Sequence, residues 1–150
     1  MLSQDQVQDV LQQLEDTGLK GCAFRKRAMQ VLAGLPHYDW CGVYRLEGDV
    51  LVLDEYVGET TEHARIAVGI GVCGTAVAED RNQIVPDVAA LDNYLACSLE
   101  TASEIVVLIR CHGAVLGQID IDSHRPGAFD ESDERLLEQL AERIVDLWSS

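Results

Sequence analysis

EIVVLIRCHGAVLGQIDIDS, residues 104–123, holds two runs rich in Val and Ile that flank His112-Gly113. β-branched residues favour strands, and a short connection that contains Gly predicts a β-hairpin. The expected strands are Glu104 to Cys111 and Ala114 to Ser123. This stretch therefore predicts a pair of antiparallel strands, around which the rest of the chain can be arranged.

A second hairpin is expected earlier in the chain. Its strands are Trp40 to Leu46 and Val50 to Tyr56, joined by the three-residue loop Glu47-Gly48-Asp49. Residues 64–68 suit a further short strand. Residues 82–103 show no long periodic run, which is typical of a functional loop in a compact domain.

Amphipathic helices are expected at both ends of the chain. The first begins at the capping box Ser3-Gln4-Asp5-Gln6 and stops by Gly18, and the second runs from about Gly21 to Gly34. Asp130 can cap a final helix whose first turn is acidic. Helices packed on an antiparallel sheet define the α+β class.

The composition limits which partners are expected. The chain has 150 residues, 47% of them hydrophobic, and a formal net charge of −15. These values are typical of one soluble folded domain over residues 1–150 with a substantial core. The longest basic cluster is Arg25-Lys26-Arg27, so neither nucleic acid nor an anionic membrane surface is expected as a partner. No apolar run reaches the roughly 20 residues of a membrane-spanning helix.

Five cysteines are spread along the chain, at positions 22, 41, 73, 97 and 111. The absence of C-x-x-C and of paired Cys/His spacing argues against a disulfide framework and a structural zinc site, so no metal is expected. The segment Met1 to Asp5 lacks the basic and apolar regions of a signal peptide, which favours a cytoplasmic location. The thiols are therefore either inert core groups or reactive groups.

A glycine-rich motif surrounds one of these thiols. Residues 69–74 match G-x-G-x-x-G, but the helix expected at 75–79 is too short for the crossover of a dinucleotide-binding domain. The motif instead predicts a tight strand-to-helix turn. Cys73 lies in this turn, just before the helix, where the helix dipole favours a thiolate. Cys97 lies in the irregular segment 93–98, and either cysteine is equally well explained as a buried small hydrophobic residue. Core packing or incidental exposure is expected for Cys22, Cys41 and Cys111.

Acidic side chains form a second candidate group. Asp120 and Asp122 are two residues apart on a predicted strand, so both face one side of the sheet, with Ile119 and Ile121 on the other side. Glu104 opens the neighbouring strand, and the hairpin can bring the three acids together. The alternative is a solvent-exposed face. Trp40 and Tyr44 also share one strand face, a pattern that usually indicates core aromatic residues.

Four segments of the chain carry a resemblance to a known family. They are Gly71-Val72-Cys73-Gly74-Thr75-Ala76, Leu95-Ala96-Cys97, Ser103-Glu104-Ile105-Val106 and Ile119-Asp120-Ile121-Asp122-Ser123. In order and spacing they resemble the free methionine-(R)-sulfoxide reductases, a GAF-domain family, and the resemblance extends from Asp39-Trp40 to the final helix. It implies a single GAF domain with a central antiparallel sheet of about six strands. Terminal helices would cover one face, loops would cover a ligand pocket on the other, and the protein would be a homodimer.

The resemblance also implies roles for individual residues. Cys97 would attack the sulfoxide sulfur and become a sulfenic acid, and Cys73 would be a partner thiol. Thioredoxin would reduce the resulting disulfide, and no cofactor is expected. The pocket for free methionine sulfoxide would be lined by Trp40, Tyr44, Glu104, Asp120 and Asp122. Its acids would bind the ammonium group that only the free amino acid offers, and one of them would supply a proton.

The chain departs from the family pattern at His63. Many members have there a third cysteine, ten residues before the position of Cys73, which often resolves the sulfenic acid. Either Cys73 or an external thiol would then resolve Cys97, or the chain has kept the pocket and lost the activity. Two alternatives to the enzyme are a non-catalytic GAF domain that binds a small ligand, and a redox sensor in which the two thiols oxidise without a substrate.

Overall fold

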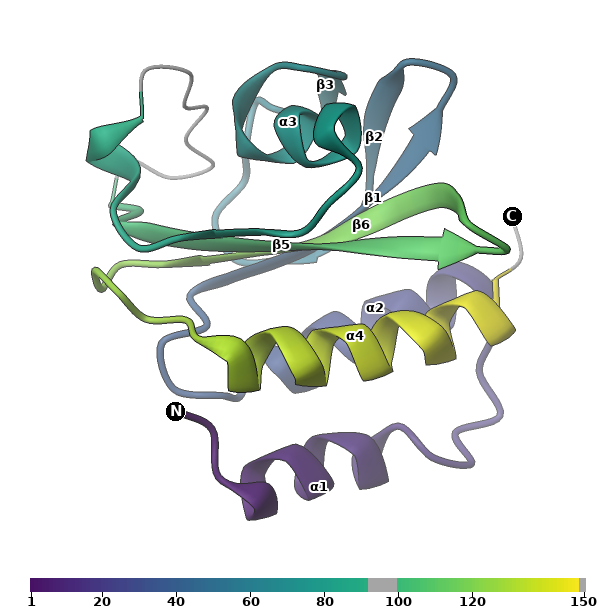
Figure 1. Ribbon diagram of the computed structural model, residues 1–150. Helices are drawn as coiled ribbons and strands as arrows, with labels where there is room; N and C mark the ends of the chain where they lie inside the picture. Colours follow the sequence, from purple (N-terminus) through teal and green to yellow (C-terminus); the bar gives the residue numbers. More distant parts are fainter. Residues whose placement is uncertain (92–99, 149–150) are drawn as a thin grey trace.

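A six-stranded antiparallel sheet forms the frame of the computed structural model, which describes residues 1–91 and 100–148 (Figure 1). The strands follow the order β3-β2-β1-β6-β5-β4 across the sheet. Their bounds are β1 Trp40–Glu47, β2 Val50–Val57, β3 Arg65–Ala67, β4 Gln83–Val85, β5 Ser103–Cys111 and β6 Ala114–Ser123. The two predicted hairpins, β1–β2 and β5–β6, are confirmed, and the pairing of β1 with β6 joins them at the centre of the sheet.

Helices cover both faces of this sheet. Figure 1 shows α2 (Gly21–Leu32) and α4 (Glu131–Asp146) packed on one face, with α1 (Gln4–Gln13) outside them. On the opposite face lies the short helix α3 (Gly71–Glu79), next to β3. A single 3₁₀ turn, Val88–Ala90, follows β4. Among the described residues, no helix is long and apolar enough to cross a membrane.

Strand alternation divides the buried residues into two cores. Ile105, Val107, Ile119 and Ile121 lie on the face covered by α2 and α4, as the alternating pattern predicts. Val106, Leu108, Trp40 and Tyr44 belong to a second apolar cluster on the face of α3. The acids Glu104, Asp120 and Asp122 share this second face. The predicted arrangement of the central hairpin is therefore confirmed, and both of its faces are buried.

The predicted helix caps are also present. Ser3 and Gln6 form the capping box at the start of α1, and Asp130 accepts a hydrogen bond from the backbone N–H of Ser132 at the start of α4. Asp133 closes a second capping box there and also accepts a 2.6 Å hydrogen bond from the Tyr38 hydroxyl. Burial raises the pKa of Asp133, while the bond from Tyr38 acts against that shift.

Two local expectations were wrong, and a third was incomplete. Glu47 pairs with Val50, so the first hairpin turns through two residues, Gly48 and Asp49, instead of three. The helix expected at 75–79 begins at Gly71, inside the glycine motif. The segment 82–103 contains the strand β4, whose three residues are too few to show a periodic pattern.

A buried ion pair fastens α2 to β2. Arg25 Nε lies 2.5 Å from Asp54 Oδ2, and the two side chains are 2% and 10% exposed. The other carboxylate oxygen of Asp54 is 3.2 Å from Arg45 Nε on β1. The Arg25 guanidinium also stacks 4.5 Å above the Trp148 ring, just beyond α4. One carboxylate thus holds together the arginines of a helix and a strand.

Candidate active site

Three of the predicted site residues form one row across the sheet. Asp122 on β6 pairs with Trp40 on β1 at one side and with Glu104 on β5 at the other. The three side chains are 1%, 2% and 2% exposed, respectively. Asp120, in the next row on the same face, is 0% exposed. The alternative of a solvent-exposed face is therefore wrong for these acids, which lie inside the protein.

Trp40 is held in a fixed position at the end of this row. Its indole N–H donates a 3.0 Å hydrogen bond to the Glu59 carbonyl, and its ring stacks on Tyr56 with centroids 5.6 Å apart. The ring also lies over Gly42, where an added Cβ would come within 2.4 Å of Trp40 Cη2. Because the N–H is already bonded to backbone, the remaining ring surface is apolar and suits an apolar group of a ligand.

Tyr44 links the same face to the connection between β2 and β3. It is 0% exposed, and its hydroxyl donates a 2.9 Å hydrogen bond to the backbone carbonyl of His63. His63 occupies the position at which the family resemblance implies a third cysteine. The contact uses the backbone of residue 63, so it does not depend on which side chain stands there.

Cys73 approaches the acids from above the sheet. It is the third residue of α3 and lies in the first helical turn, where its sequence context predicted a position just before the helix. The glycines make this entry possible: Gly71 has a φ of +66°, and a Cβ on Gly74 would lie 2.5 Å from the Ala67 carbonyl oxygen. The tight strand-to-helix turn expected from the glycine motif is therefore confirmed.

The thiol and two of the acids converge on one point. Cys73 Sγ donates a 3.9 Å hydrogen bond to Glu104 Oε2. One ligand atom each from Cys73, Glu104 and Asp120 lies within 4.8 Å of the other two, and all three residues are buried. They border a cavity of about 10 Å³, together with Ile66 and residues 70–72. A thiol and carboxyl groups in contact provide a reducing group and an acid at one place, and they are also donor types that Zn²⁺ accepts.

The other cysteines differ from Cys73. Cys41 lies on the opposite face of the sheet, where burial, and secondarily the charges of Asp122 and Asp120, raise the pKa of its thiol. Cys22 is exposed on α2, and Cys111 is half-buried at the end of β5. The incidental or core roles expected for these three are in accord with their positions. Cys97 lies outside the described residues.

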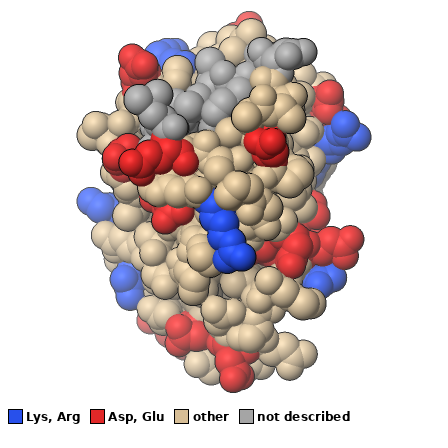
Figure 2. All heavy atoms as spheres, turned by 90° about the vertical axis from the view of Figure 1, so that its left-hand side faces the viewer, with Lys and Arg blue, Asp and Glu red and all other residues tan. Residues whose placement is uncertain are grey.

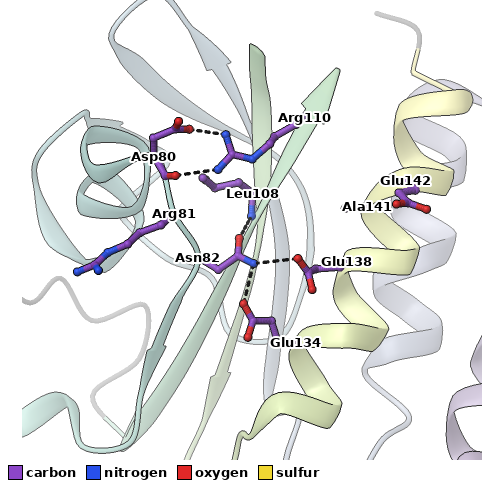
Figure 3. A pocket seen from close by; sticks show the side chains of 9 residues that line it. All are labelled: Asp80, Arg81, Asn82, Leu108, Arg110, Glu134, Glu138, Ala141 and Glu142. Carbon is purple, nitrogen blue, oxygen red and sulfur yellow. Dashed lines mark hydrogen bonds and ion pairs between the residues drawn. The ribbon is translucent and has the colours of Figure 1, made fainter. Parts of the chain in front are cut away.

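A separate groove of about 490 Å³ lies between α4 and the connection from α3 to β4 (Figure 3). Asn82 spans it, since its side-chain N–H group donates to Glu134 at 2.8 Å and its carbonyl oxygen accepts from the Leu108 N–H at 2.8 Å. Arg110 pairs with Asp80 at one end. These polar groups already bind one another, so the groove is explained by the attachment of β4 to α4.

Charged side chains are unevenly distributed on the surface. On the face shown in Figure 2, the Lys and Arg side chains are separated from one another, whereas Asp and Glu side chains gather at several places. A phosphate-binding surface would need the opposite distribution.

Comparison with known proteins shows which family this chain resembles. The family model for the GAF domain matches residues 24–145. The free methionine-R-sulfoxide reductase of Escherichia coli is 41% identical over 110 residues, which are 73% of this chain and 66% of that protein, just under two thirds of its length. A solved structure of the Neisseria meningitidis free methionine-R-sulfoxide reductase with its substrate has a TM-score of 0.90 at 32% identity, covering 99% of this chain and 92% of that one. The type II enzyme from Thermoplasma acidophilum has a TM-score of 0.78 at 37% identity, covering 95% and 94%.

The chain belongs to the GAF-domain family of free methionine-R-sulfoxide reductases. The resemblance seen in the sequence is thereby confirmed, as are the GAF fold and the sheet of about six strands.

One buried polar residue on this face of the reductase-family fold was missed by the sequence analysis. Gln118 on β6 is 0% exposed and precedes Asp120 by two positions. The alternation along β6 that places Asp120 and Asp122 on one face also places Gln118 there, and this pattern could have identified the residue from the sequence. An uncharged residue at the edge of an acidic pattern does not attract notice until the register of the sheet is known.

Proposed function

We propose that this protein reduces free L-methionine-(R)-sulfoxide to methionine by thiol chemistry. The observation that carries the proposal is the convergence of Cys73, Glu104 and Asp120 at a buried point in a chain of this family. Thiols supply the two electrons of sulfoxide reduction, and carboxyl groups supply its proton. The activity named for the similar proteins of E. coli and N. meningitidis supports the same reaction.

In the proposed reaction the Cys97 thiolate attacks the sulfur of the sulfoxide while a carboxyl group of the pocket protonates the sulfoxide oxygen. The oxygen passes to Cys97 as a sulfenic acid and methionine leaves, so the substrate sulfur gains two electrons and the cysteine sulfur loses two. The Cys73 thiol, or an external thiol, then displaces water from the sulfenic acid to form a disulfide. A dithiol reductant returns both sulfurs to thiols. The role of Cys97 rests on the family resemblance.

The buried acids have a second role in this proposal, which is to select the free amino acid. An ammonium group is present in free methionine sulfoxide and absent from a methionine residue within a polypeptide. Carboxylates of Glu104, Asp120 and Asp122 would pair with that ammonium group, and charge-assisted hydrogen bonds of this kind are strong. The apolar surface of Trp40 would receive the S-methyl group.

The proposal also covers the domain, the oligomeric state, the reductant and the cellular location of the enzyme. We propose that residues 1–150 act as one domain, that two copies form a homodimer, and that thioredoxin is the reductant. A cytoplasmic location would suit an enzyme whose thiols must be kept reduced. Assays with and without thioredoxin, and the mass of the protein in solution, test the reductant and the dimer separately.

The activity is tested by following NADPH oxidation with thioredoxin and thioredoxin reductase. The wild-type protein should reduce the free R epimer and leave the S epimer and a peptide-bound sulfoxide unchanged. Cys97→Ser should abolish turnover, whereas Cys22→Ser, at an exposed cysteine far from the acids in sequence, should keep it. Turnover that survives Cys97→Ser would refute the mechanism. Binding of methionine sulfoxide without reduction would favour the non-catalytic ligand-binding alternative.

A further inference from the structure

Gln118 is an unexplained polar group in the core beside the candidate active site. Its register partners are Tyr44 on β1 and Leu108 on β5, so its side chain lies on the face that carries the acids. It is 0% exposed. Among the residues that the structure describes, neither the amide nitrogen nor the amide oxygen of Gln118 has a hydrogen-bond partner. An unsatisfied polar group in a protein core destabilises the fold, so its presence requires an explanation.

The neighbouring side chains show which chemistry this amide adds to the site. The Trp40 N–H and the Tyr44 hydroxyl already donate to backbone carbonyls, and Cys73 donates to Glu104. Ionised carboxylates can only accept hydrogen bonds. The amide of Gln118 therefore brings uncommitted N–H donors to a face otherwise rich in acceptors. A ligand oxygen is the group that would satisfy them.

We propose that Gln118 is a substrate-binding residue whose amide donates a hydrogen bond to an oxygen of the bound sulfoxide amino acid. This inference rests on the proposed function and names a further contact at the same site. Asp120, which borders the cavity, is two positions further along β6, or about 6.5–7 Å. A glutamine side chain that leans along the strand spans most of this distance.

Two oxygen groups of the substrate share the required chemistry, namely the sulfoxide oxygen and the α-carboxylate. Both accept hydrogen bonds, and neither can receive one from an ionised Glu104 or Asp120. A neutral donor placed among acids would thus hold the acceptor end of a zwitterionic ligand while the acids hold its ammonium group. Within residues 1–91 and 100–148 no group satisfies the Gln118 amide, so its pairing with a bound ligand adds affinity.

The test replaces Gln118 with Met, which keeps the length and flexibility of the side chain and removes both polar atoms. We expect KM for methionine sulfoxide to rise about tenfold, and the affinity of the Cys97→Ser background for the same ligand to fall about as much. The melting temperature should stay the same or rise, because an unsatisfied buried amide is removed. The matched control is Leu108→Met in the same row, which changes packing without polarity and should leave KM unchanged.

Two further ligands identify which oxygen is bound. Methionine lacks the sulfoxide oxygen, and 3-(methylsulfinyl)propylamine lacks the carboxylate. If Gln118→Met weakens binding of methionine, the carboxylate is the acceptor. If it weakens binding of the amine sulfoxide, the acceptor is the sulfoxide oxygen. Either result supports the proposal.

The proposal is overturned if KM and affinity for all three ligands stay within twofold of the wild type. It is also overturned if Gln118→Met lowers the melting temperature more than Leu108→Met does, because the amide would then have a structural partner. If either result is found while the wild-type protein reduces methionine sulfoxide, only the proposed role of Gln118 is refuted. The proposed function then stands. A wild-type protein that neither binds nor reduces methionine sulfoxide would refute the proposed function and this contact together.

Discussion

Glu104 on β5 lies directly opposite Asp122 on β6, and both carboxyl side chains are buried. Directly opposed residues have Cβ atoms about 4.5–5.5 Å apart, a distance at which two negative charges repel each other. The repulsion between two such groups is relieved when one of them holds a proton or when a cation lies between them. The arrangement therefore fits a site that binds an ammonium group and transfers a proton better than it fits a structural role.

Glu104→Gln and Asp122→Asn test whether these acids serve catalysis. Each amide keeps the shape of the acid and cannot donate an acidic proton, so kcat/KM should fall about 100-fold or more. The melting temperature should fall far less than the activity, since the repulsion between the two carboxylates is removed. Glu47→Gln, at the exposed end of β1, is the matched control and should keep full activity. Equal loss of activity and stability in the two site variants would point to a structural role.

Cys73→Ser tests which thiol resolves the sulfenic acid. The thiol lies 3.9 Å from Glu104 Oε2, at the centre of the buried cluster. If Cys73 resolves Cys97, the variant should accumulate Cys97 sulfenic acid after one turnover, seen by mass spectrometry as a dimedone adduct. Cys111→Ser, which changes a half-buried cysteine at the end of β5, should show no such increase. An unlabelled Cys97 in Cys73→Ser would mean that an external thiol performs this step.

Much of this site could be predicted from local sequence patterns. Asp120 and Asp122 alternate with Ile119 and Ile121, and this pattern alone places the two acids on one strand face. The position of Cys73 followed from the glycine motif, with an error of one helical turn. Burial of the acids could not be predicted, because it depends on α3 lying over the sheet, and an acidic strand face is usually exposed to solvent.

Other features depend on contacts between distant parts of the chain. The residues opposite Gln118 on the neighbouring strands are Tyr44 and Leu108, and only the register of the three strands brings them together. Likewise, β4 has three residues and is defined by its pairing with β5 instead of by a pattern of its own. A residue or strand of this kind carries no local signal, since its environment is created by the tertiary fold.

Gly42→Ala tests whether the position of Trp40 matters for the substrate. The new methyl group would lie 2.4 Å from Cη2 and 2.5 Å from Cζ3 of Trp40, so the indole ring has to move. We expect KM to rise several-fold and stability to fall by about 1–3 kcal/mol, as for other overpacked cores. Denaturant unfolding and steady-state kinetics measure the two effects.

The double variant Trp40→Phe/Gly42→Ala separates this clash from other effects of the alanine. Phenylalanine lacks the outer part of the indole ring, which contains the atoms nearest to the new methyl group. Gly42→Ala should therefore destabilise the Trp40→Phe protein less than it destabilises the wild type. If the loss is the same in both backgrounds, the clash with Trp40 is not its cause.

Thiol labelling should distinguish Cys41 from the exposed Cys22. Only the thiolate reacts with iodoacetamide, and burial raises the pKa of Cys41 well above the ordinary value of about 8.5. Raising the pH from 7 to 9 should therefore leave Cys41 unlabelled in the folded protein while Cys22 is modified. Peptide mass spectrometry gives the labelled fraction at each position. Labelling of Cys41 at the rate of Cys22 would contradict the inert core position assigned to it.

Asp54→Ala tests the ion pair that fastens α2 to the sheet. The substitution leaves the guanidinium of Arg25, which is 2% exposed, without the carboxylate that lies 2.5 Å from its Nε. Breaking a buried pair on one side destabilises proteins by about 3–5 kcal/mol, because a desolvated charge loses its partner. Arg81→Ala breaks the pair with Glu79, whose side chains are 71% and 46% exposed, and should change stability by about 1 kcal/mol or less. Urea unfolding compares the two variants, and equal losses would show that Asp54 does not stabilise a buried charge.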